Sequence, residues 1–102
     1  MFELSIFYDE ECTKPVRGGK ITVDTVRAGE PCERILYFRN NIDKHLDINI
    51  GIISDDLDVT LLKRDYSLLP NEIIPIMFLF NPRMERETAI SVELKLDVTY
   101  ML

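Results

Sequence analysis

Residues 90–102 read ISVELKLDVTYML, a stretch in which apolar and polar side chains alternate. The apolar set comprises Ile90, Val92, Leu94, Leu96, Val98, Tyr100 and Leu102, and the polar set comprises Ser91, Glu93, Lys95, Asp97 and Thr99. Successive side chains of a strand point to opposite faces, so this period of two predicts a long strand with one face on a core and the other in water. A helix would scatter the same residues around its circumference.

The rest of the chain repeats this pattern in shorter pieces. Residues 45–52 read HLDINIGI and alternate without a fault, and further strand segments are predicted at residues 2–8, 21–23, 33–39, 57–61 and 73–80. Turn-forming residues separate them, among them Gly18-Gly19, Asn40-Asn41 and Pro70-Asn71. Seven short strands at this spacing predict an all-β fold, an antiparallel sandwich of the immunoglobulin-like kind with about seven strands.

Length and composition describe one soluble domain covering residues 1–102. Apolar residues make up 46% of the chain and charged residues 29%, which is ordinary for a globular protein. The net charge of −6 comes without a basic stripe, so we expect no nucleic-acid partner. We expect no membrane contact, because the longest apolar run is far shorter than a bilayer crossing requires. The first residues lack a signal peptide pattern, which predicts a cytoplasmic protein or one carried in a virion or other assembly.

The order of turns and strands resembles an immunoglobulin-like domain of the major-sperm-protein type. The segments that carry the resemblance are Val26-Arg27-Ala28-Gly29, Leu36 to Asn41, Leu69-Pro70-Asn71-Glu72 and Phe78 to Pro82. Such sandwiches also occur as accessory modules of virions. The resemblance implies a structural or interaction role, whereas the absence of Trp and the close spacing of the cysteines set the chain apart from antibody domains.

Residues 73–80 read IIPIMFLF and are apolar on both parities. One parity fills a core, and the other parity, which contains Ile73, Met77 and Leu79, is either covered by neighbouring segments or exposed as a contact surface for a partner. We take Ile73, Met77 and Leu79 as candidate partner-binding residues. Pro75 cannot donate to a ladder, which predicts that this strand is an edge strand or carries a bulge.

Two acidic clusters, Asp9-Glu10-Glu11 and Ser54 to Asp58, could supply oxygen ligands to calcium, but neither matches a calcium-binding loop, and solvated turns explain them. Cys12 and Cys32 are interpreted as free thiols, with a disulfide between neighbouring loops as the alternative. Pairing either cysteine with His45 as a nucleophile has no supporting motif, and no metal site, cofactor or catalytic residue is predicted.

The sequence therefore predicts a non-catalytic structural or protein-interaction module. It would dock in a larger assembly, or with copies of itself, through a sheet face or an edge strand. The alternative is a ligand-binding module that uses acidic loops for calcium or carbohydrate.

Overall fold

The computed structural model describes residues 3–17, 19–23, 32–53, 57–82 and 90–100, and every regular element in these ranges is a β-strand. The strands are β1 (Leu4–Phe7), β2 (Lys20–Val23), β3 (Cys32–Asn40), β4 (Leu46–Ile53), β5 (Leu57–Thr60), β6 (Asp65–Leu68), β7 (Ile73–Pro82) and β8 (Ile90–Tyr100). The all-β prediction is confirmed. None of the described residues belongs to a helix with the length and hydropathy that crossing a bilayer requires.

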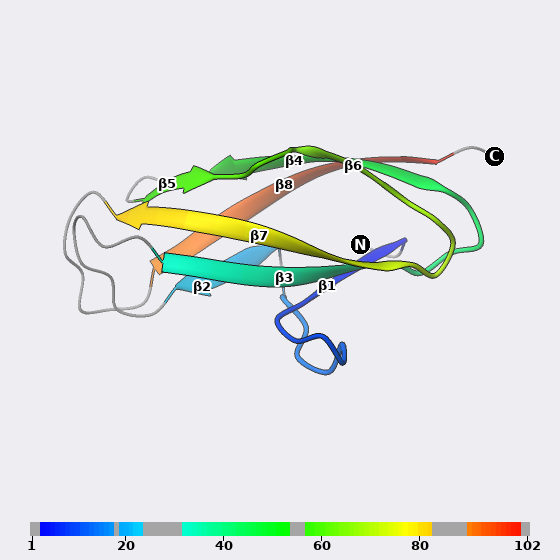
Figure 1. Ribbon diagram of the computed structural model, residues 1–102, viewed down its shortest axis with the longest axis horizontal. Coiled ribbons are helices and arrows are strands. Elements are labelled where there is room, and N and C mark those ends of the chain that lie inside the picture. The colour runs from blue at the N-terminus through cyan, green and yellow to red at the C-terminus, as the bar shows by residue number, and fades with distance from the viewer. Residues whose placement is uncertain (1–2, 18, 24–31, 54–56, 83–89, 101–102) are drawn as a thin grey trace.

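The strands form two antiparallel sheets of four strands each (Figure 1). Sheet A has the order β1-β3-β7-β5, and sheet B has the order β2-β8-β4-β6. All seven predicted strand segments are present, and β6 is an additional strand of the described chain. The immunoglobulin-like topology and the resemblance to the major-sperm-protein type stay predictions.

One hydrophobic core fills the space between the two sheets, which makes the fold a β-sandwich. Sheet A contributes Leu4, Ile6, Leu36, Phe38, Ile76, Phe78 and Phe80, and sheet B contributes Ile21, Leu46, Ile48, Ile50, Leu68, Val92 and Leu94. Phe38, Phe78 and Phe80 form a stacked row, with ring centroids 6.4 and 6.3 Å apart. In β4 and β8 the apolar set of alternating residues faces the core, as the sequence predicts.

The turn before β7 is held by hydrogen bonds between Leu69 and Glu72. The Leu69 N–H donates to Glu72 Oε1 over 2.9 Å, and the Glu72 N–H donates to the Leu69 carbonyl over 3.0 Å. Asn71 has a φ of 62°, a left-handed conformation that Asn tolerates better than most residues. These residues of the resemblance therefore have a structural role, while Val26 to Gly29 lie outside the described residues.

Pro75 lies at a position where its missing N–H breaks no ladder bond. The Asn40 N–H donates to the Glu72 carbonyl, so Asn40 and Glu72 form a hydrogen-bonded pair. Hydrogen-bonded and non-hydrogen-bonded pairs alternate along an antiparallel ladder. Tyr37 and Pro75 therefore form a non-hydrogen-bonded pair, whose backbone groups point away from each other. On its other side β7 pairs with β5 only from Leu79 to Pro82. β7 is therefore an inner strand of sheet A, and the alternative that made it an edge strand is wrong. In the described part of the chain, however, no strand pairs with β7 on the β5 side at Pro75.

Candidate functional site

The two sheets differ in what they present on their outer faces. On sheet A the outward positions of β3 and β7 are mainly apolar, and we call Ile35, Tyr37, Ile73, Pro75, Met77 and Leu79 the sheet A face. Ile35, Ile73 and Met77 are 47%, 44% and 41% exposed, and Tyr37 and Leu79 are half-buried. Scattered exposed apolar residues are ordinary, but a contiguous set of this kind marks a contact surface.

The β3–β7 register makes the sheet A face continuous. Ile35 lies directly opposite Met77, and Tyr37 lies opposite Pro75. Leu79 and Ile73 close the two ends of this row, opposite Glu33 and Arg39 respectively. Cross-strand neighbours on one face contact each other, so these side chains form one surface rather than isolated positions.

The structure places the predicted residues Ile73, Met77 and Leu79 on this one face, and their role in partner binding stays a prediction. Ile35 and Tyr37 belong to the same face but are not among the residues predicted from the sequence. The signal was nevertheless present, because residues 35–38 are apolar on both parities, as residues 73–80 are.

The end of sheet A nearest β1 is covered. Phe7 also points outward from β1, opposite Tyr37, yet it is buried. The Arg39 guanidinium carbon lies 4.9 Å from the centroid of the Phe7 ring, a cation–π contact that shields one side of the ring. Among the side chains of sheet A that the structure describes, exposed apolar surface is therefore concentrated over β3 and β7.

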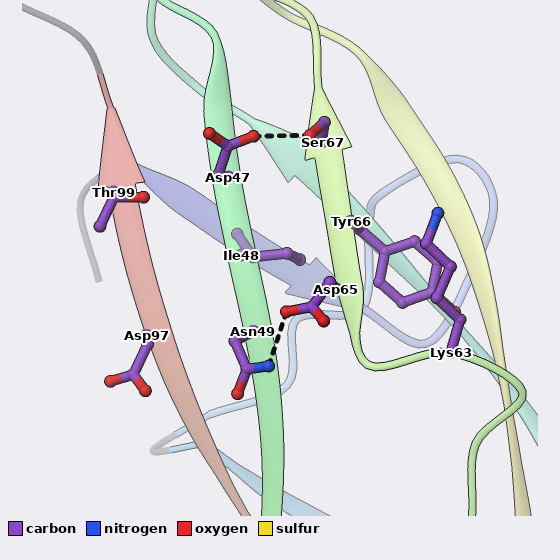
Figure 2. A pocket seen from close by; sticks show the side chains of 9 residues that line it. All are labelled: Asp47, Ile48, Asn49, Lys63, Asp65, Tyr66, Ser67, Asp97 and Thr99. Carbon is purple, nitrogen blue, oxygen red and sulfur yellow. Dashed lines mark hydrogen bonds between the residues drawn. The ribbon is translucent and has the colours of Figure 1, made fainter.

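The outer face of sheet B is hydrophilic and contains a shallow hollow, which Figure 2 shows. Its polar side chains bond across the strands: the Ser67 hydroxyl donates to Asp47 over 2.6 Å, and the Asn49 amide donates to Asp65 over 2.7 Å. The Lys63 ammonium lies 5.0 Å from the centroid of the Tyr66 ring. Partial burial raises the pKa of the Tyr66 phenol. Because Asp47 and Asp65 already accept bonds from neighbours, the hollow is an ordinary solvated sheet face.

The acidic cluster at Asp9 serves to close the loop after β1. The Asp9 carboxylate accepts bonds from the Lys14 N–H at 2.8 Å, from the Thr13 N–H at 3.0 Å and from the Thr13 hydroxyl. The Thr13 hydroxyl is the largest cause that lowers the pKa of Asp9. Among the described residues no group of three His, Cys, Asp or Glu side chains is arranged to hold a metal. Of the second cluster, Ser54 to Asp56 lie outside the described residues, and Leu57 and Asp58 begin β5.

Both cysteines are free thiols, and both are partly exposed. Cys12 lies in the loop after β1 with a φ of 59°, and Cys32 begins β3. The His45 imidazole Nε2 lies 3.5 Å from a carboxylate oxygen of Asp47, and both side chains are exposed. In the described ranges, the polar contact of the His45 imidazole is therefore with a carboxylate and not with a thiol.

No protein-family model, no curated protein and no solved structure matches the chain.

Proposed function

We propose that the protein is a non-catalytic protein-interaction module with an immunoglobulin-like sandwich fold, docking in a larger assembly through the sheet A face. The observation that carries the proposal is the exposed Ile35–Met77 pair, at the centre of a row of outward apolar side chains. A role as a virion accessory module is one form that such an assembly could take.

The contrast between the two sheets supports this choice of surface. Outward positions of sheet B carry Asp47, Asn49, Asp65, Asp97 and similar groups, as expected for a face in water. The sheet A face is built from the same period of two but with apolar residues at the outward positions. Burial of such a patch against a partner is favourable by about 25 cal/mol for each Å² removed from water.

The occupant that fits the sheet A face is another protein chain with an apolar surface of its own. Glu33 and Arg39, at the two ends of the row, carry opposite charges. A protein interface commonly combines an apolar centre with a polar rim of this kind. Self-association of two copies is the other outcome that the test below separates.

The ligand-binding alternative receives less support. The Asp9 carboxylate is engaged by Thr13 and Lys14, and the carboxylates of the sheet B hollow accept bonds from Ser67 and Asn49. Calcium needs six to eight oxygen ligands gathered at one place. We therefore do not propose calcium or carbohydrate binding as the function.

The experiment compares Met77→Lys and Ile35→Lys with Asn49→Lys, a control on the outer face of sheet B. Chemical cross-linking in the native source, followed by mass spectrometry, identifies the chain that contacts β3 and β7, and size-exclusion chromatography reports self-association. Met77→Lys and Ile35→Lys should keep the strand signature in circular dichroism and lose the contact, whereas Asn49→Lys should keep it. If the contact survives both changes on the sheet A face, the proposal is wrong.

A further inference from the structure

β8 is longer than the strand that pairs with its outer edge. β4 pairs with β8 from Glu93 to Tyr100, whereas β2 pairs with β8 only from Ile90 to Glu93. One more bond follows, from the Leu94 N–H to the Gly19 carbonyl over 2.7 Å. In Figure 1, β2 lies beside the first part of β8, and β8 then continues alone on that side toward the C-terminus. Within the described ranges, no strand pairs with this edge from Lys95 to Tyr100.

The backbone groups on this edge have a defined direction. The Ile50 N–H donates to the Arg64 carbonyl over 2.9 Å, away from its β8 partner Leu96. Antiparallel pairs alternate, so the Ile50–Leu96 and Ile48–Val98 pairs both have backbone groups that point away from each other. The N–H and C=O groups of Leu96 and Val98 therefore point outward from β8, on the same side as the Leu94 N–H that Gly19 accepts.

A groove runs along the same edge of β8, between β8 in sheet B and β1 in sheet A. Its first part is lined by Leu4 to Phe7 of β1, by Pro15, Val16 and Gly19, and by Leu94 and Leu96. Its second part is lined by Glu3 and by Leu96 to Tyr100. Leu96 lines both parts, and we call the two together the β1–β8 groove.

The core-facing side chains of β8 lose their cover where β2 ends. Val92 and Leu94 are buried, Leu96 and Val98 are half-buried, and Tyr100 is 41% exposed. All five belong to the parity that faces the core. In the part of the chain that the structure describes, the open edge therefore combines unpaired backbone groups with a floor of incompletely covered apolar side chains. These are the two requirements for adding a strand to a sheet.

We propose that the β1–β8 groove accepts an extended strand from another protein, with apolar side chains at alternate positions and Lys or Arg between them. Leu96 and Val98 would exchange backbone hydrogen bonds with this strand, and its apolar side chains would cover the groove floor. Of the three charged residues in the groove lining and along the open edge of the described structure, Glu3 and Asp97 are acidic and Lys95 is basic, so the balance of charge favours a basic strand. Two copies paired through this edge would instead bring like charges together, in a chain of net charge −6. The inference goes beyond the proposed function because it uses a different surface from the sheet A face.

The test uses a synthetic peptide in which valine alternates with lysine and threonine. The control peptide has the same composition with its valines clustered. Amide hydrogen exchange read by NMR should show that the alternating peptide slows exchange at Leu96 and Val98 by at least about tenfold, and the clustered peptide should not. Three results would each overturn the proposal. They are no protection up to about 1 mM peptide, protection confined to the sheet A face, and protection that grows with protein concentration when no peptide is present.

Two variants assign the contact to this edge. Val98→Pro removes an N–H that points outward and breaks no bond to β4, so it should keep the fold and abolish peptide binding. Asp97→Lys, at an exposed position, should weaken the lysine peptide and favour a glutamate version of it. Met77→Lys, on the sheet A face, should bind the peptide as the parent does, which separates this inference from the proposed function. Peptide binding that neither Val98→Pro nor Asp97→Lys changes would show that the strand binds elsewhere.

Discussion

The side-chain amide of Asn40, at the end of β3 in sheet A, donates a hydrogen bond over 3.3 Å to the carbonyl of Leu68, at the end of β6 in sheet B. The same Nδ2 lies 2.7 Å from the Lys44 carbonyl and 3.0 Å from the Leu69 carbonyl. Asn40 Oδ1 accepts the Ile42 N–H over 3.0 Å. One fully buried amide therefore joins the two sheets and two of the loops between them.

Replacing Asn40 with Ala should destabilise the domain by about 2–4 kcal/mol, because several backbone groups lose their partner in a buried site. Asn49→Ala is the matched control, since Asn49 is exposed and makes a surface bond to Asp65. It should change stability by about 0.5 kcal/mol or less. Urea unfolding measures both, and equal midpoints for the two variants would contradict a structural role for the buried amide.

The assignment of faces predicts a strong asymmetry between neighbouring positions of one strand. Ile50→Asp and Leu94→Asp should unfold the domain, because an unpaired charge in the core costs several kcal/mol of a total stability of about 5–15 kcal/mol. Asn49→Ser and Glu93→Gln, at exposed positions next to them, should have little effect. Thermal melts followed by circular dichroism compare the two pairs. Similar melting temperatures for all four variants would mean that the faces are assigned wrongly.

The strands that could be predicted from the sequence are those with a one-sided environment. β4 and β8 alternate strictly because one face packs on the core and the other meets water. β6 was not predicted because its four residues, Asp65 to Leu68, include no β-branched residue, whereas the equally short strands β2 and β5 do. The extent of the sheet A face was only half predicted, since Ile35 and Tyr37 join it through pairing with β7.

The β1–β8 groove was beyond the reach of sequence reasoning. It depends on where β2 stops along β8, a pairing between segments about 70 residues apart in the chain. No local pattern at residues 94–100 distinguishes a strand paired on both edges from one paired on a single edge. The incomplete burial of Leu96 and Val98 follows from this long-range arrangement.

The loop after β1 should respond to acid through Asp9. Hydrogen bonds from Thr13 and Lys14 hold the pKa of Asp9 below its ordinary value of 3.8. At a pH above the ordinary pKa, Asp9 is charged and its hydrogen bonds close the loop. This contribution is lost as the pH falls through the lowered pKa that Asp9 has in the folded protein. NMR titration should give an Asp9 midpoint below 3.8, with the Thr13 and Lys14 amide shifts following it. Asp9→Asn should remove that transition from both amides, and its persistence would assign it to another group.

Pro75 offers a test of the β3–β7 register. Its nitrogen points away from β3, so Pro75→Ala adds an N–H that finds no partner in the described part of sheet A. The variant should therefore gain no ladder bond, and it should lose about 0.4–1 kcal/mol because alanine leaves the unfolded chain more freedom than proline does.

Ile76→Pro is the contrasting change at the next position. The Leu36–Ile76 pair belongs to the class whose backbone groups point toward each other, as the Asn40–Glu72 pair does. Proline there removes a ladder bond and a core side chain, which should cost about 3 kcal/mol or more. Ile76→Ala separates the two effects, because it removes the side chain and keeps the N–H. If Ile76→Pro is no less stable than Ile76→Ala in urea, the register assigned to β3 and β7 is shifted by one residue.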